Sequence, residues 1–152
     1  MRESLQPFQT VRDVLHKLRE LHESCQRRFA RRADSASTGG DHRLQALLSF
    51  VATREQEQQQ ALARFDAQED TRLASYVQSV PADLVEEVKR TGSPDGDFDT
   101  VRADAEARDR AFVQLYEQLA DNVGPNAGGI FHDLAEQHRR NQGRLHEALL
   151  DY

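Results

Sequence analysis

Apolar residues recur every three or four positions over four long stretches of the chain, the pattern of amphipathic α-helices. We predict helices over residues 10–32, 42–68, 98–123 and 127–150. No alternating pattern typical of strands competes, so the sequence predicts an all-α protein. The inward positions are Val11, Val14, Leu15, Leu18, Cys25 and Phe29; Leu44, Leu47, Leu48, Val51, Leu62 and Phe65; Val101, Ala105, Phe112, Leu115, Tyr116 and Leu119; and Ile130, Phe131, Leu134, Leu145 and Leu149.

Signals for helix ends flank these stretches. Thr10 with Asp13 three residues later is similar to a capping box, and Asp41 is a candidate N-cap for the second helix. Residues 33–40 have the composition of a loop, and residues 124–126 (Gly-Pro-Asn) are predicted to separate the last two helices.

The segment of residues 70–98 has a different pattern and predicts two short helices followed by a turn. Pro81 can open the second short helix, which would end at Gly92. The apolar residues are Leu73, Tyr76 and Val77 in the first short helix, and Leu84 and Val88 in the second. The segment is long enough to cross a helical bundle from end to end, which would let the second and third long helices run parallel. We therefore expect one four-helix-bundle domain over residues 1–152.

Composition and charge narrow the class of protein. Hydrophobic residues make up 38% and charged residues 30%, which suits long helices that are apolar on one side only. A net charge of −6 argues against nucleic acid or an anionic membrane as the main partner. A single cysteine forms no intramolecular disulfide, and neither a signal peptide nor a membrane span is visible. We therefore expect a cytoplasmic protein.

The two halves of the chain match in the spacing of their stripes. Positions 14, 18, 22, 25 and 29 correspond to 101, 105, 109, 112 and 116. Positions 48, 51, 55, 58 and 62 likewise correspond to 131, 134, 138, 141 and 145. This correspondence predicts two helix pairs related by a pseudo-twofold axis.

Polar residues interrupt the stripes near the middle of each long helix. They are His22, Glu55, Gln58, Asp109, His138 and Asn141. A buried polar group without a partner costs about 1–3 kcal/mol, and a buried charge costs more. We therefore expect these side chains to pair with one another, or to hold water or an ion.

This layout resembles the ferritin-like superfamily, above all its rubrerythrin-like branch. The resemblance covers essentially the whole chain and is carried by FVATREQEQQQAL (50–62), DRAFVQLYEQLA (109–120) and IFHDLAEQHRRNQGRL (130–145). In that family, a Glu on each of helices 1 and 3 and a Glu-x-x-His on each of helices 2 and 4 surround two iron ions. The resemblance implies a four-helix bundle with a long crossover between helices 2 and 3.

The residues at the family's ligand positions depart from its pattern. Glu55 keeps its acid but Gln58 replaces the histidine, while His138 and Asn141 replace the second Glu-x-x-His pair. Asp109 is a shorter acid. His22 occupies the helix 1 position, although a slight rotation of that helix would bring Glu23 inward instead. Since amides are poor ligands for iron, we do not expect an intact di-iron oxidase centre.

Two interpretations of the polar layer stay open. The first is a metal-free hydrogen-bond network in which Glu55 or Asp109 pairs with His22 or His138. The second is one transition metal ion (iron, zinc or manganese), held by those four residues. In either case the supporting polar groups are Glu23, Gln58, Asn141 and the hydroxyl of Tyr116. A wrong helix phase would instead leave several of these side chains in water.

The other candidate residues favour structural roles. Cys25 is expected to be a small core residue rather than a nucleophile. Three histidines fall at or outside the edges of the stripes and are expected to be exposed: His16, His132 and His146. The acids at 95, 97 and 99 lack the later glutamate of a calcium loop, and we interpret them as a turn and a helix cap.

The favoured function is that of a ferritin-like bundle with an altered or lost di-metal site. It would have no cofactor and would act as a binding or scaffold protein, expected to be a homodimer with an unidentified protein partner. The alternative is a metal-dependent oxidoreductase or metal-binding protein with a mononuclear site. A third hypothesis is a module that docks a partner through residues 70–98, with Tyr76, Val77 and Leu84 as anchors.

Overall fold

The computed structural model describes residues 9–36, 41–68 and 70–149 of the chain. Over these residues it contains α-helices, one 3-10 helix and no strand, which confirms the all-α prediction. The elements are α1 (Val11–Ala36), α2 (His42–Ala67), η2 (Thr71–Ala74), α3 (Ala82–Arg90), α4 (Phe98–Asp121) and α5 (Pro125–Leu149).

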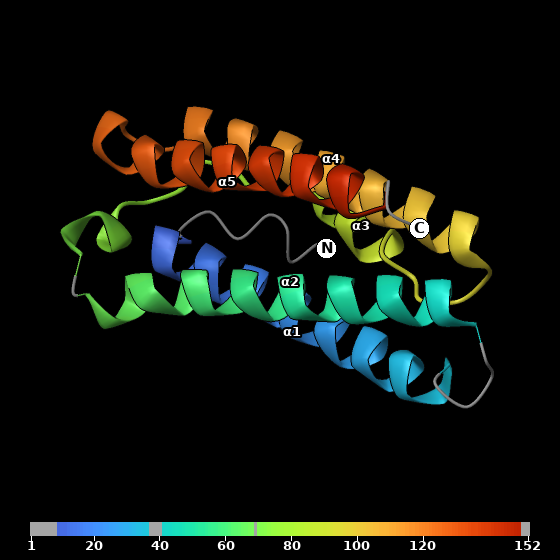
Figure 1. Ribbon diagram of the computed structural model, residues 1–152. Coiled ribbons are helices and arrows are strands. Elements are labelled where there is room, and N and C mark those ends of the chain that lie inside the picture. The colour runs from blue at the N-terminus through green and yellow to red at the C-terminus, as the bar shows by residue number, and fades with distance from the viewer. Residues whose placement is uncertain (1–8, 37–40, 69, 150–152) are drawn as a thin grey trace.

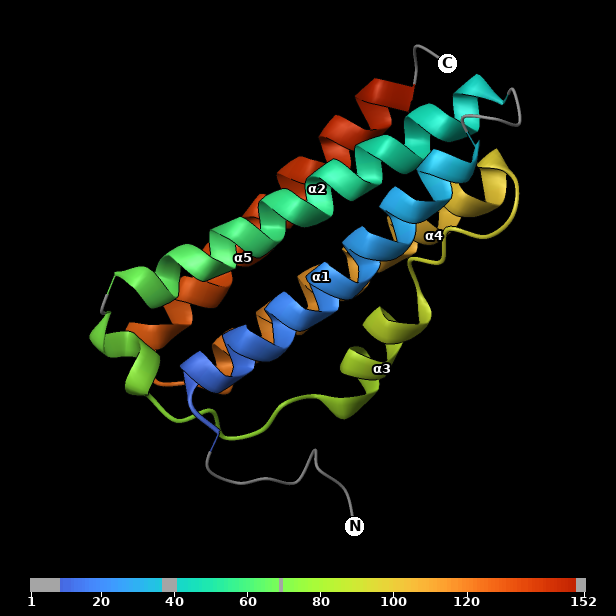
Figure 2. The ribbon, with the colours of Figure 1, turned by 90° about the horizontal axis from the view of Figure 1, so that it is seen from below.

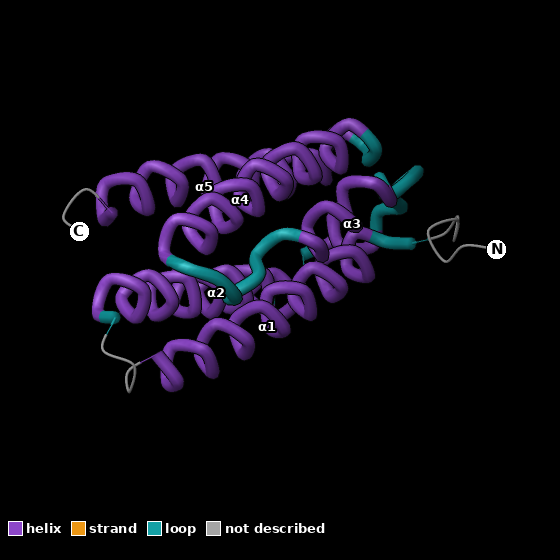
Figure 3. Tube along the Cα trace, turned by 90° about the vertical axis from the view of Figure 1, so that its right-hand side faces the viewer, coloured by secondary structure: helices purple, strands orange, loops and turns teal. Residues whose placement is uncertain are grey.

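The long helices form two pairs that face each other. In Figure 1, α1 lies along α2, and α4 lies along α5. The colours of Figures 1 and 2 show that the chain runs in the same direction through α2 and α4, and in the opposite direction through α1 and α5. The segment between α2 and α4 returns the chain from one end of the long helices to the other. Within that segment, α3 packs against α4 on the side where α4 faces α1 (Figure 3).

Side-chain caps fix the starts of three long helices where the sequence predicted them. Thr10 Oγ1 accepts from the backbone N–H of Asp13 at 3.2 Å, and the Asp13 carboxylate accepts from the N–H of Thr10 at 3.0 Å. Asp41 accepts from the N–H of Leu44, and Asp97 accepts from that of Thr100. The fourth start differs, because α5 begins at Pro125 rather than after it. Proline suits the first turn of a helix, where its missing N–H has no partner to lose.

The first short helix in the segment between α2 and α4 is shorter than predicted. It ends at Ala74, so Tyr76 and Val77 lie outside it. The reason is backbone pairing with the start of α1: the N–H of Val77 donates to Gln9, and the N–H of Val11 donates to Ser75. Tyr76 is 63% exposed.

The prediction that three residues of this segment anchor a partner is wrong for two of them. Val77 and Leu84 are buried and belong to the hydrophobic core. They therefore contribute to folding and offer no surface to a partner.

The apolar core is divided into two clusters. One surrounds Leu18, Leu62, Phe112 and Leu134 near η2 and α3, and the other surrounds Phe29 towards the opposite end. On each long helix, the predicted polar positions fall between these clusters. Nearly all the predicted inward apolar side chains are buried, although Phe65 is only partly so. The side chain of Leu149 lies outside the described residues.

Gly92 follows α3 and adopts a backbone conformation that favours glycine, with φ of 77°. A Cβ atom at this position would lie 2.5 Å from Cδ of Arg108. The chain therefore passes so close to the Arg108 side chain that only glycine fits.

We expect Gly92→Ala to lower the free energy of unfolding by about 1–3 kcal/mol, because it adds backbone strain and displaces Arg108. Urea denaturation followed by circular dichroism measures this change. The matched control is Gly143→Ala, in α5, where no atom lies within 4 Å of the added Cβ. That change should raise the free energy by up to about 1 kcal/mol, since alanine favours a helix interior. Equal effects of the two substitutions would contradict the role given to Gly92.

Candidate functional site: a buried polar layer

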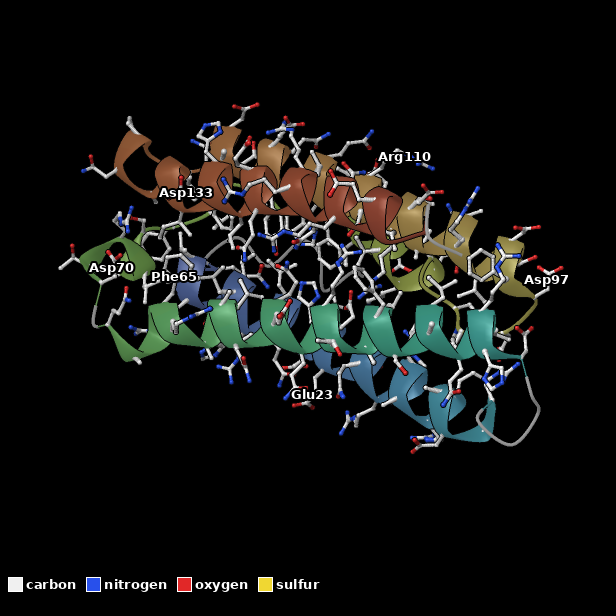
Figure 4. The ribbon with its side chains drawn as sticks, in the orientation of Figure 1. Glu23, Phe65, Asp70, Asp97, Arg110 and Asp133 are labelled. Atoms are coloured by element: carbon white, nitrogen blue, oxygen red, sulfur yellow. The ribbon has the colours of Figure 1, made fainter. Side chains whose placement is uncertain are left out.

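The six polar residues predicted on the stripes are all buried: His22, Glu55, Gln58, Asp109, His138 and Asn141. The choice between His22 and Glu23 is settled, because the His22 side chain is fully enclosed whereas 46% of the Glu23 side chain is exposed. Glu23 accepts from Gln59 and pairs with Arg27 on the outer side of the α1–α2 pair (Figure 4). The prediction that Glu23 supports the central layer is therefore wrong, since the phase of α1 turns it outward.

Two arginines that sequence reasoning missed occupy the layer. Arg54 is buried, and its Nη2 donates to both carboxylate oxygens of Asp109 at 2.8 and 2.7 Å. Arg108 is also buried, and its Nη2 donates to Oε1 of Glu55 at 3.1 Å. The pairing is reciprocal, because α2 contributes Arg54 and Glu55 while α4 contributes Arg108 and Asp109. Each helix therefore supplies one cation and one anion to the other.

The histidines complete each carboxylate's set of partners. Nδ1 of His22 lies 2.9 Å from Oε1 of Glu55, and Nδ1 of His138 lies 3.4 Å from Oδ1 of Asp109. Each carboxylate thus contacts one imidazole from its neighbouring helix and one guanidinium from the opposite pair. The contacts agree with the repeat in the sequence, which relates His22 to Asp109 and Glu55 to His138. Acid and imidazole exchange places between the halves.

The charges in the layer are set by burial and by these pairs. Burial alone would raise the pKa of Glu55, but the Arg108 guanidinium and the His22 imidazole outweigh it and hold this pKa well below its usual range. Burial lowers the pKa of His22, although Glu55 opposes the change. At neutral pH, His22 is therefore an uncharged ring that donates its Nδ1–H to an ionised Glu55.

Several polar atoms in the layer have no hydrogen-bond partner among the described residues: Nε2 of His22, Nε2 of His138, the Tyr116 hydroxyl and Oε1 of Gln58. Phe112 stacks on both imidazoles, with ring centroids 4.5 Å from His22 and 4.8 Å from His138. Tyr116 is fully buried beside His138, as expected, and burial raises the pKa of its phenol. The two Nε2 atoms and this hydroxyl lie within one aromatic cluster.

The four predicted metal ligands lie in one layer, where the two carboxylates pair with arginines and with the two imidazoles. In the described part of the chain, no group of three or more His, Cys, Asp or Glu side chains is arranged to hold a metal ion. The physical reason is that the arginines lie where a cation would have to contact the two carboxylates. Gln58 and Asn141 take no part in the ion pairs and line a groove between α2 and α5.

The sequence did contain a signal for one missed arginine. Arg108 falls on the stripe of α4, between Ala105 and Phe112 at helical spacing, so the pattern places it inward. Because long cationic side chains usually extend into solvent, the burial of Arg108 was not predicted. Arg54 lies at the edge of the α2 stripe, next to Glu55, where the pattern alone does not determine its direction.

The remaining candidates have structural roles. Cys25 is buried, and burial raises the pKa of its thiol to about 12, so the thiolate needed of a nucleophile does not form near neutral pH. Its Sγ contacts the carbonyl oxygen of Gly92 at 3.8 Å. His16 and His132 are exposed as predicted. The side chain of His146 lies outside the described residues.

Comparison of the chain with protein-family models, with curated proteins and with solved structures found no match in any of the three. Over the described residues, none of the helices combines the length and the apolar character needed to cross a membrane.

We expect Arg108→Met to lower the free energy of unfolding by about 3–5 kcal/mol, because it leaves the buried Glu55 carboxylate without its cation. Chemical denaturation measures the loss. The control is Arg139→Met, which removes a half-exposed ion pair with Glu117 and should cost less than about 1 kcal/mol. A second variant that also carries Glu55→Leu should be more stable than Arg108→Met alone. Equal losses for the buried and exposed arginines would refute the ion-pair explanation.

The free energy of unfolding should also fall as the pH decreases, because His22 binds a proton more readily in the unfolded chain than in the folded protein. The pKa of His22 is lower in the folded protein, so below about pH 6.5 the unfolded chain binds more protons and is favoured. The groups facing this ring are Glu55, Arg108 and His138. Glu55, whose pKa is depressed, adds a loss of stability only below about pH 4.5.

The expected contribution of His22 is up to about 1.4 kcal/mol per pH unit below pH 6.5. Denaturation at several values between about pH 7.5 and 5 measures it. His22→Gln should flatten the profile. A profile that His22→Gln does not alter would rule out this assignment.

Proposed function

We propose that this protein is a ferritin-like four-helix-bundle protein whose di-metal site has been replaced by ion pairs. It acts as a binding or scaffold protein and not as an iron oxidase. The parallel course of α2 and α4, joined by the long segment that carries α3, supports the bundle assignment. The correspondence between the two halves of the polar layer supports the link to the family's internal symmetry.

The observation that carries the proposal is the reciprocal pairing of Arg54 with Asp109 and of Arg108 with Glu55. Both pairs are buried, and each joins one carboxylate to one guanidinium. Before the imidazoles are counted, their charges cancel. A divalent ion added at this place would leave a net positive charge in a region of low polarity, which is costly.

The residues present do not fit two iron ions. The two carboxylates at ligand positions are already bound by guanidinium groups, and amides stand at the positions of the family's histidines. Amide oxygens are weak ligands for iron. We therefore assign no oxidase step to this layer.

A second candidate is a single transition metal ion bound by the imidazoles. One observation favours it: Nε2 of His22 and Nε2 of His138 are both unpartnered, and each ring is oriented by a carboxylate at Nδ1. Histidines that bind metals are commonly oriented in this way. The hydroxyl of Tyr116 is the third unpartnered group nearby. Iron, zinc and manganese are the ions to test, and the charge balance described above opposes them.

The assembly and location of the protein stay predictions. We propose a homodimer formed through a helix face, a cytoplasmic location, and no role for nucleic acid or membrane. Sedimentation equilibrium of the full chain would measure the oligomeric state.

The proposal predicts that the purified chain contains no stoichiometric transition metal. Elemental analysis after incubation with iron(II), zinc or manganese and removal of excess ion should give far less than one ion per chain, and iron(II) oxidation should match the rate without protein. The matched variant is His22→Gln with His138→Gln, which should leave the metal content unchanged. About one ion per wild-type chain that this double variant loses would establish the second candidate and overturn the first.

A further inference from the structure

A groove with a volume of about 370 Å³ lies between α2 and α5. The two helices that line it lie on the side of the molecule away from α3 (Figure 2). Its volume falls in the range of small-molecule sites, about 300–1,000 Å³. The groove is therefore large enough for a small metabolite.

The groove is positively charged in a protein that is acidic overall. Arg64 from α2 and Arg140 and Arg144 from α5 line it. Among the described residues that line it, Glu57 is the one acid, so their formal charge is three minus one, or +2. The whole chain carries −6. None of the three arginines pairs with an acidic group of the described residues. Guanidinium groups gathered without counter-ions attract an anion and bind phosphate or carboxylate in a bidentate manner.

Buried amides extend the groove towards the polar layer. Gln58 lines the groove but is only 2% exposed, and Asn141 beside it is 7% exposed. Oε1 of Gln58 has no hydrogen-bond partner among the described residues. This oxygen is itself closed to solvent, so a ligand hydroxyl reaches it only when the Gln58 amide turns towards the groove, which would pair an otherwise unsatisfied acceptor.

We propose that the α2–α5 groove binds a small anion that also carries hydroxyl groups. Its phosphate or carboxylate contacts the guanidinium groups of Arg140, Arg144 and Arg64. Once the Gln58 amide turns towards the groove, one hydroxyl of the ligand donates to Oε1 of Gln58. A phosphate ester with two negative charges would neutralise the groove. This inference rests on the proposed function of a binding protein and names the chemical class of the ligand.

Isothermal titration of the full chain at low ionic strength tests the proposal with four probes: glucose 6-phosphate, gluconate, inorganic phosphate and glucose. Glucose 6-phosphate or gluconate should bind more tightly than inorganic phosphate, and uncharged glucose should not bind. Tighter binding of glucose 6-phosphate identifies a phosphate ligand, and tighter binding of gluconate identifies a carboxylate ligand. No binding of either hydroxylated anion, or binding of glucose as tight as that of its phosphate, would overturn the proposal.

Variants locate the site. Arg140→Gln with Arg144→Gln should weaken binding about tenfold or more, because it removes two charge-assisted contacts. The matched control, Arg31→Gln with Arg32→Gln, removes the same charge from a second arginine-lined groove beside Ser93 and should change the affinity little. Equal weakening by the two double variants would mean that net charge alone causes the effect, and it would contradict the assignment of the ligand to the α2–α5 groove.

Gln58→Leu tests the hydroxyl contact. It should abolish the preference for the hydroxylated anion over inorganic phosphate while leaving the affinity for inorganic phosphate unchanged, and an unaltered preference would contradict the role of Gln58. Circular dichroism checks that this variant folds, and the exposed arginine variants test the site if it does not.

Metal content is measured on the same samples. Stoichiometric metal with anion binding intact refutes only the proposed metal-free function, whereas absent anion binding in metal-free protein refutes only the groove.

Discussion

Two carboxylates buried between helix pairs need positive partners, and the way in which this chain supplies them governs much of its structure. Glu55 and Asp109 lie where water cannot solvate them, so each must be neutralised by a neighbouring side chain. Arginine suits this place better than lysine, because its planar group can serve a carboxylate and backbone carbonyls together. Arg108 does so by donating to Glu55, to the carbonyl of Val88 and to that of Leu21. One side chain thereby joins α4 to α2, α3 and α1.

The same arginine explains several features of the segment between α2 and α4. Its contact with Val88 fixes the end of α3 against α4. Its aliphatic carbons fill the space beside Gly92, so that position has no room for a side chain. Cys25 contacts the same turn from α1. The polar layer therefore does more than interrupt the core, because it positions the segment that connects the two helix pairs.

The sequence predicted a large part of this arrangement because hydrophobic period and capping residues are local signals. The long helices begin within about two residues of their predicted starts, and all six stripe-breaking polar side chains proved to be buried. The partners of those side chains were harder to foresee, since Arg54 and Asp109 are 55 positions apart and meet only through the packing of α2 on α4. The prediction that Tyr76 lies in a short helix was wrong for a related reason. Its backbone pairs with that of Thr10, which is distant in sequence, and this pairing replaces the local helical pattern. Periodicity identifies which residues turn inward but not which inward residues meet.

Reciprocal ion pairs also restrict how α2 and α4 can slide past each other. A shift of one helical turn, about 5.4 Å, would separate Arg54 from Asp109 and Arg108 from Glu55 together, leaving four buried charges unpaired. Apolar side chains alone tolerate such a shift more readily, because one leucine can replace another in the same space. The layer thus fixes the axial position of the α1–α2 pair against the α4–α5 pair. That position in turn determines which residues of α2 and α5 line the groove together, among them Gln58, Asn141 and the three arginines. Any selectivity of the groove for a ligand therefore depends on ion pairs that the ligand never touches.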